Sequence, residues 1–174
     1  MNRIVQTDTL DTLINVLCEQ QWVRTSSYFA PMLSQQLYEE AHQLYTAGHV
    51  RSASIGQGRQ AQENQDIRQT HIHWFEPTQL SAAQRQLWTE LEHIKERLNQ
   101  TCFLNLVEFE CHYALYPLGA FYRRHLDQFR FDKRRQVSFS FYLNPSWQPA
   151  DGGCLRLYLH TEKPQTIDIL PQAN

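Results

Sequence analysis

The sequence predicts an α+β domain in which helices come first and a mainly antiparallel sheet or barrel follows. Apolar residues recur at helical spacing over roughly the first hundred positions, and from about residue 108 they alternate with polar ones. Turn signals separate the later segments into short strands. The chain has 174 residues, of which 41% are hydrophobic, and it shows no internal repeat. We therefore expect one domain with a packed core.

Composition restricts the class of protein. A formal net charge of −2 does not indicate a nucleic-acid partner. The chain holds no apolar run of about 18 residues, so no membrane span is predicted, and its first residues lack the apolar core of a signal peptide. No Cys-x-x-Cys spacing occurs among the four cysteines, Cys18, Cys102, Cys111 and Cys154. These features favour reduced thiols and a cytoplasmic location over disulfides or a zinc knuckle.

Residues 1–50 are expected to form a helical support. The spacing of Leu10, Leu13, Ile14 and Leu17 predicts a first helix, which Asp8 or Thr9 would cap. A second helix is predicted from the same spacing, with Gly48 as its C-terminal stop; its apolar positions are Leu33, Leu37, Ala41 and Leu44. Between these helices, residues 22–28 are compatible with either a short strand or a loop.

Residues 51–107 are expected to hold a loop, a strand and a helix. The glycine- and glutamine-rich stretch 54–65 predicts a flexible connector, with a lid over a bound peptide as the alternative. Its Gly-x-Gly pair lacks the strand and helix of a phosphate loop. A short strand is predicted at 70–75, ended by Pro77. A further amphipathic helix is indicated by Leu87, Leu91, Ile94 and Leu98.

Residues 108–174 are expected to form the β-rich core. Alternation or β-rich composition predicts strands at 109–116, 137–143, 154–159 and 166–170. Turn residues separate them at 117–119, 144–146 and 151–153. The segment 120–129, between the first two strands, contains His125 and Asp127.

His125 and Asp127 form the candidate metal pair. On a strand their side chains would share one face, with Cα atoms roughly 6.5 Å apart. An imidazole nitrogen and a carboxylate oxygen could then converge on one metal ion, as two thirds of a 2-His-1-carboxylate facial triad. Taken alone, the pair is compatible with a surface His–Asp contact, so its neighbours in the sequence decide its significance.

Several motifs occur together in a characteristic order. They are Arg51-x-Ala-x-Ile-Gly-x-Gly58, Ile67-Arg68 with Ile72-x-Trp74, Tyr116-Pro-x-Gly119, Tyr122-x-x-His125-x-Asp127, Phe141-Tyr-Leu-Asn144 with Trp147, and Asp151-Gly-Gly-x-Leu155. This set resembles the Fe(II)- and 2-oxoglutarate-dependent oxygenases of the prolyl-4-hydroxylase type, over roughly residues 51–170. The resemblance implies a double-stranded β-helix, or jelly roll, buttressed by the N-terminal helices.

The resemblance also implies roles for individual residues. His125 and Asp127 match two iron ligands. Tyr116, Tyr122 and Tyr142 match positions that line the 2-oxoglutarate pocket, and Leu155 matches its apolar wall; core aromatic residues are the structural alternative for the tyrosines. The implied cofactors are Fe(II) and 2-oxoglutarate, with ascorbate as an auxiliary reductant. The implied substrates are O₂ and a protein or peptide side chain, proline first.

The family pattern continues with a distal histidine ligand and an arginine that anchors 2-oxoglutarate. This chain ends at Asn174, before the strands that would carry them. The expectation is therefore a jelly roll that lacks its last strands, with weak or no hydroxylase activity, because an iron ligand and a charge-assisted carboxylate partner are missing. Uncovered sheet edges would favour a homodimer or poor solubility.

Two other hypotheses remain open. The chain could be a non-catalytic derivative that serves as a binding module, or a small cupin-like zinc or iron protein with His112 or His160 as third ligand. His71 and His73 share a strand face but lack a carboxylate motif, which favours ordinary strand histidines. Arg156 is expected to face solvent. A basic turn is expected to be solvated, with steering of an acidic substrate as the alternative; it contains Arg130, Lys133, Arg134 and Arg135.

Overall fold

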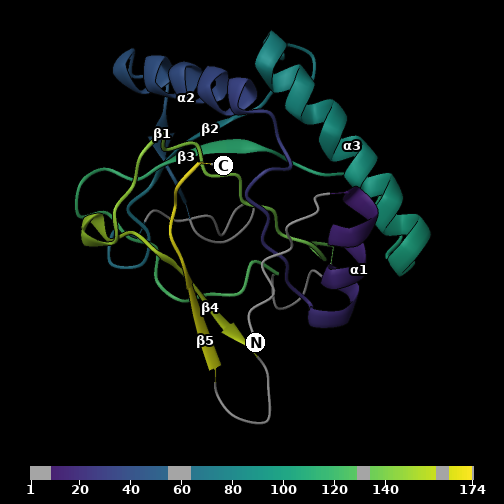
Figure 1. Cartoon of the computed structure of the whole chain (residues 1–174). Helices are drawn as coiled ribbons and strands as arrows, with labels where there is room; N and C mark the ends of the chain where they lie inside the picture. The colour runs from purple at the N-terminus through teal and green to yellow at the C-terminus, as the bar shows by residue number, and fades with distance from the viewer. Residues whose placement is uncertain (1–8, 55–63, 129–133, 160–164, 174) are drawn as a thin grey trace.

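The computed structural model describes residues 9–54, 64–128, 134–159 and 165–173. Its elements are α1 (Leu10–Gln20), α2 (Pro31–Thr46), β1 (Arg51–Ser52), β2 (His71–Trp74), α3 (Ala82–Cys102), β3 (His112–Leu115), a 3-10 turn (Pro149–Asp151), β4 (Leu155–Leu159) and β5 (Gln165–Ile169). In Figure 1, α2 lies along one face of the sheet that contains β2 and β3, and α1 packs beside the far end of α3. Helices thus support one side of the β structure, as the sequence predicted.

Each helix begins with a residue suited to its first turn, and α1 and α3 have side-chain caps there. Thr9 caps α1, because its hydroxyl accepts a hydrogen bond from the Thr12 backbone N–H. Pro31 occupies the first turn of α2, where a missing N–H costs nothing. A capping box starts α3, in which the Ser81 hydroxyl and the Gln84 side chain each accept from the other residue's backbone N–H.

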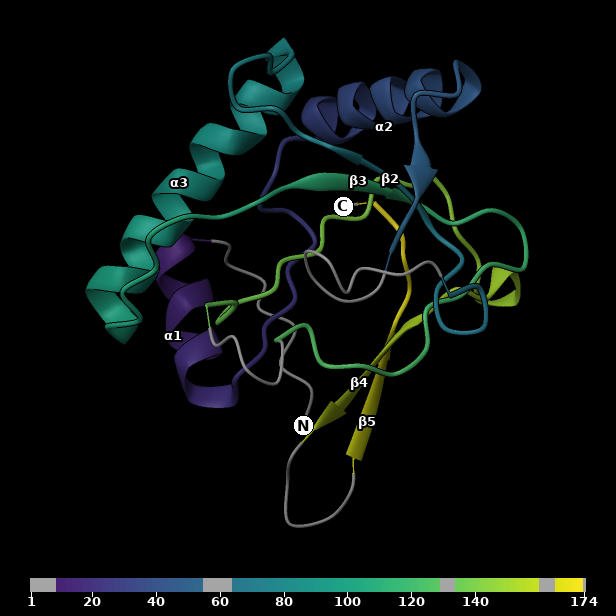
Figure 2. The ribbon, with the colours of Figure 1, turned by 180° about the vertical axis from the view of Figure 1, so that it is seen from behind.

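The strands form two separate antiparallel sheets. One has the order β1-β2-β3, with Ile72 opposite both Arg51 and Ala114, and the other pairs β4 with β5. After β5 the chain returns toward the three-stranded sheet, where Gln172 forms a parallel bridge with Asn144 (Figure 2). The predicted strands near 70–75, 109–116, 154–159 and 166–170 are therefore present, with shifts of up to three residues at their ends.

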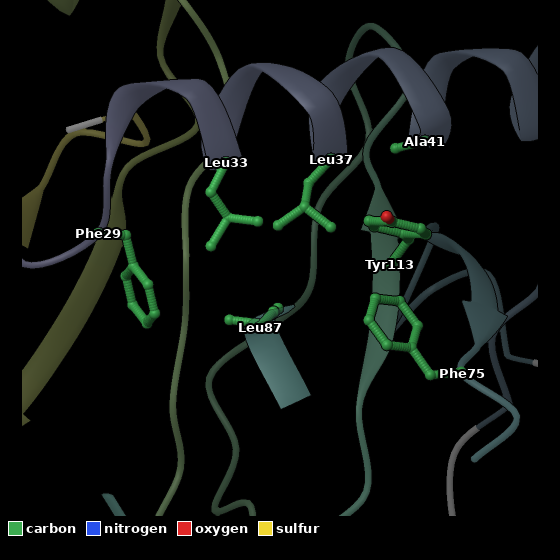
Figure 3. Close-up of a cluster of buried hydrophobic side chains, with 7 residues drawn as sticks. All are labelled: Phe29, Leu33, Leu37, Ala41, Phe75, Leu87 and Tyr113. Atoms are coloured by element: carbon green, nitrogen blue, oxygen red, sulfur yellow. The ribbon is translucent and has the colours of Figure 1, made fainter. Parts of the chain in front are cut away.

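The core lies between α2, α3 and one face of the three-stranded sheet. Figure 3 shows Leu33 and Leu37 pointing from α2 toward Leu87 of α3, with Tyr113 of β3 beneath Ala41. Leu37 is completely buried and Leu33 is 1% exposed. The helical spacing of the apolar residues in α2 therefore did identify its buried face.

The predicted strand 137–143, and the segment with His125 and Asp127 whose geometry was considered as a strand, lie outside any strand of the described structure. Residues 137–143 do not alternate in burial, because 137–140 are exposed and 141–143 are half-buried, although Phe141 stacks on Phe29 with ring centroids 4.5 Å apart. A β-strand needs a hydrogen-bonded neighbour, however, and this segment has no ladder within the described residues. Residues 120–128 likewise contain only an isolated bridge, between Tyr122 and Arg68. Residues 22–28 form a loop, one of the two predicted alternatives.

The prediction that all four cysteines are reduced is wrong, because Cys18 of α1 and Cys102 of α3 form a disulfide. Their Cα atoms are 6.3 Å apart, within the range that a disulfide spans. Sequence spacing could not reveal it, since the two residues are 84 positions apart. Cys111 and Cys154 are free thiols.

Within the described ranges, none of the helices combines the length and apolar character needed to cross a membrane. Most of the 54–65 loop, with Gly56 and Gly58, lies outside the described residues, as do His160, Arg130 and Lys133.

Candidate metal centre

The side chains of His125 and Asp127 converge. His125 Nε2 lies 3.0 Å from Asp127 Oδ1, and His125 Nδ1 lies 2.6 Å from the backbone carbonyl oxygen of Arg123. Because a carbonyl oxygen only accepts, Nδ1 must carry the proton and donate it. In a neutral imidazole this leaves a bare Nε2 facing a carboxylate. A metal ion could be bound by this Nε2 and the carboxylate together.

The geometry of the pair suits adjacent ligands of one metal ion. In an octahedral site with bonds of about 2.1 Å, neighbouring ligand atoms are about 3.0 Å apart, which matches the Nε2–Oδ1 separation. The Nδ1–H bond to a backbone carbonyl is the usual outer contact of a metal-bound histidine. The His125 and Asp127 side chains are 33% and 51% exposed, so further ligands can approach. These residues therefore fit Fe(II).

The metal pair is held beside the three-stranded sheet without belonging to a strand. Arg68 and Tyr122 form an antiparallel bridge, and flanking backbone bonds of 2.9 Å join Gln69 to Phe121 and Arg123 to Ile67. The Tyr122 ring then stacks on the His125 imidazole, with centroids 3.6 Å apart and planes 19° apart. The sequence thus predicted the convergence correctly but attributed it to a regular strand.

Arg68 is a site residue to which sequence reasoning gave no role. Its guanidinium carbon lies 4.6 Å from the centre of the Tyr122 ring, and its Nε–H donates to Thr70 Oγ1 at 2.7 Å. Thr70 is only 1% exposed, so the contact is firmly supported. The position of Arg68 just before β2 was visible in the motif. That its side chain would lie over Tyr122, which stacks on His125, depends on the bridge between Arg68 and Tyr122.

The three predicted pocket tyrosines are all protonated at neutral pH. Burial raises the pKa of Tyr142 to about 12 and raises the pKa values of Tyr116 and Tyr122, while the positive charge of Arg68 partly opposes the rise in the latter two. The negative charge of Asp127 acts on both Tyr116 and Tyr122, and Tyr116 acts on Tyr142. Tyr122 thus lies against the metal pair, and Tyr116 is close enough to feel the charge of Asp127, while Tyr142 is linked to them through Tyr116.

His112 faces the same region from β3. It is paired with Trp74, and their rings are 4.6 Å apart, while Tyr113 points into the core from the opposite face. Burial, and then the charge of Arg68, lower the pKa of His112, so its imidazole is neutral at pH 7. Nevertheless, no group of three His, Cys, Asp or Glu side chains suited to a metal gathers within the described ranges. His112 thus does not complete a metal site with the pair.

Leu155, the predicted apolar wall, opens β4 opposite Ile169 and is 36% exposed. The β4 strand lies near the segment that carries His125 and Asp127, because the guanidinium carbon of the adjacent Arg124 lies 4.0 Å from the centre of the Tyr158 ring in β4. Arg156, as predicted, is exposed; it makes two 2.7 Å bonds to Asp168.

The other predicted polar residues are engaged elsewhere. His73 Nδ1 lies 2.7 Å from the His49 carbonyl oxygen, and His71 packs edge-on against Tyr45. Arg135, of the predicted basic turn, forms an ion pair with Glu110.

A histidine and a carboxylate 3.0 Å apart, near phenols and an arginine on an α+β scaffold of antiparallel sheets, are compatible with the iron-dependent oxygenase class. Comparison with known proteins agrees. A sequence profile of the 2OG-Fe(II) oxygenase superfamily matches residues 111–174. The crystal structure of a Pseudomonas putida prolyl-4-hydroxylase superposes with a TM-score of 0.83 at 36% sequence identity, covering 95% of this chain and 82% of that one.

The chain therefore belongs to the 2OG-Fe(II) oxygenase superfamily, among its prolyl-hydroxylase-like members. Both the resemblance inferred from the motifs and the α+β, jelly-roll fold class are confirmed. Fe(II) and 2-oxoglutarate are the cofactor and cosubstrate that the family implies.

Proposed function

We propose that this protein is an Fe(II)- and 2-oxoglutarate-dependent dioxygenase that hydroxylates a protein or peptide side chain, proline first. The observation that carries the proposal is the 3.0 Å approach of His125 Nε2 to Asp127 Oδ1, with Nδ1 fixed by a backbone carbonyl. The likeness to a Pseudomonas putida prolyl-4-hydroxylase supports proline as the first substrate to test. O₂ would be the second substrate.

When bound, iron and 2-oxoglutarate supply the oxidative chemistry, in which O₂ gives one oxygen atom to a substrate C–H bond and one to succinate, with release of CO₂. His125 and Asp127 would hold two positions on the iron. The phenols of Tyr116, Tyr122 and Tyr142 would donate hydrogen bonds to carboxylate oxygens nearby. Ascorbate would serve as an auxiliary reductant.

A second candidate function is a binding module on an oxygenase scaffold. The observation that favours it is that no group of three possible metal ligands gathers among the described residues. Two protein ligands would hold iron more weakly than a complete facial triad. The two functions differ in whether a chelated iron complex forms and turns over.

The decisive experiment is an anaerobic titration with Fe(II) and 2-oxoglutarate, monitored by the visible charge-transfer band of the chelated complex. A saturable band that His125→Ala and Asp127→Ala abolish is expected. His93→Ala is the matched control, because His93 is exposed on α3. Succinate and hydroxyproline would then be measured with ascorbate, O₂ and a proline peptide. A folded protein that gives no band would refute the oxygenase proposal and leave the binding module.

A further inference from the structure

We infer that Arg68 is a carboxylate-binding residue of the candidate metal centre. The inference concerns the ligand of the same site and rests on the proposed function only for the question of which carboxylate is bound. The source is either 2-oxoglutarate or an acidic side chain of a peptide substrate. The chemistry that both share is a planar carboxylate facing a guanidinium.

The first support is that Arg68 is held in place before any ligand arrives. Its Nε–H bonds to Thr70, its guanidinium lies over the Tyr122 ring, and its backbone bridges Tyr122. The Nε–H is engaged by Thr70, and the guanidinium also makes a hydrogen-bonding contact with the Tyr122 side chain. Since a guanidinium has five N–H donors, further donors remain beside the ring that stacks on His125. Because the side chain is already ordered, binding an anion there costs little further entropy.

The second support is an unbalanced charge. Three other arginines have a carboxylate partner: Arg97 pairs with Asp11, Arg135 with Glu110 and Arg156 with Asp168. Arg68 is less exposed than Arg135 and Arg156, yet within the described ranges no carboxylate lies at salt-bridge distance from it. A partly buried cation favours an anionic partner, because desolvation strengthens the interaction between them.

The third support is the set of groups that surround Arg68. Its positive charge acts on Tyr116, Tyr122 and His112, and these are the groups on which Asp127 also acts. The guanidinium and the metal pair therefore share one set of neighbours. A carboxylate held by Arg68 would meet phenolic O–H donors on the same side. Substrate or cosubstrate would thus be bound within reach of the metal ligands.

A metal-free titration tests the carboxylate site directly. Glutarate, a simple dicarboxylate, is added to ¹⁵N-labelled protein while the Arg68 Nε–H resonance is followed by NMR. Its bond to Thr70 slows exchange with water, and its loss in Arg68→Lys assigns it. A saturable shift in the millimolar range is expected, and it should persist in Arg85→Gln, an exposed α3 arginine. No shift would overturn the inference whether or not iron binds.

Two further measurements identify which molecule supplies the carboxylate. The affinity for 2-oxoglutarate is measured from the charge-transfer band in Arg68→Gln, in Arg85→Gln and in the unchanged protein. The KM values of a peptide with a Glu near the proline and of its Gln analogue are compared in the same proteins. Loss of a charge-assisted bidentate contact should weaken binding by about tenfold to a hundredfold.

Weaker 2-oxoglutarate binding in Arg68→Gln assigns the contact to the cosubstrate. A lost preference for the acidic peptide, with 2-oxoglutarate affinity intact, assigns it to the substrate. Changes below twofold in both, at an unaltered melting temperature, overturn the inference. A missing band in the unchanged protein would instead count against the proposed function, and the glutarate titration would still decide the role of Arg68.

Discussion

Removal of the Cys18–Cys102 disulfide should destabilise the fold by a predictable amount. The bond closes a loop of 84 residues between α1 and α3. In the chain-entropy treatment, such a loop lowers the entropy of the unfolded chain by about 15 cal/mol/K, or about 4.6 kcal/mol at 25 °C. Native disulfides deliver typically about 2–4 kcal/mol, so we expect a loss in that range.

The native contacts between the two helices should survive this change. Arg97 of α3 forms an ion pair with Asp11 of α1 at 2.5 Å, and the two helices pack together. Leu13 and Val16 of α1 also pack against Val23 in the following loop. The predicted loss of stability therefore arises mainly in the unfolded state, where the open chain has more conformations.

The test is urea unfolding of the oxidised protein and of a Cys18→Ser/Cys102→Ser variant. The variant should show a lower midpoint, and Cys154→Ser, which removes an exposed free thiol, should not. Alkylation of the denatured, unreduced protein should label two thiols. Four labelled thiols, or a difference in unfolding free energy below about 1 kcal/mol, would refute the reasoning.

Two further predictions concern the core and the site. Leu37→Ala should lower the free energy of unfolding by about 2–5 kcal/mol, because Leu37 is fully buried. Met32 is 65% exposed on the same helix, so Met32→Ala should change that free energy by less than about 0.5 kcal/mol. Equal losses of unfolding free energy for the two variants in urea would contradict this. His112 should titrate by NMR with a pKa below 6.5, since burial disfavours its charged form. Between that pKa and about 6.5 the unfolded chain binds more protons, so His112 makes stability fall as pH is lowered through this window. His112→Gln should remove that contribution, and an unchanged slope of stability against pH would count against it.

Local periodicity was sufficient to predict the helices and most strands. The spacing of Leu33, Leu37 and Ala41 identified the buried face of α2, and β3 appeared inside the predicted strand 109–116. Residues 137–143 show what periodicity leaves open. Alternation placed Phe141 against the core, but strand pairing depends on a neighbour that the segment's own residues do not specify.

The site was predicted in part, and the missing part is long-range. His125 and Asp127 are two positions apart, so local geometry made their convergence predictable. Arg68 lies more than fifty positions before them, and only the pairing of its backbone with Tyr122 brings its charge to the site. The Cys18–Cys102 bond escaped prediction for the same reason, because no local pattern links α1 to the end of α3.

The same short sheet serves both stability and the site, and the division follows the alternation of its side chains. Along β3, Tyr113 packs into the core beneath α2, while the adjacent His112 lies on the other face against Trp74. The residues just before β2 extend this arrangement. Thr70 accepts a hydrogen bond from Ala53 through its backbone carbonyl and from Arg68 through its hydroxyl, which connects the sheet to the guanidinium. The metal pair is therefore positioned by its attachment to a packed sheet. Thr70→Val, which removes only the hydroxyl, should free the Arg68 side chain while leaving the packing of the core in place.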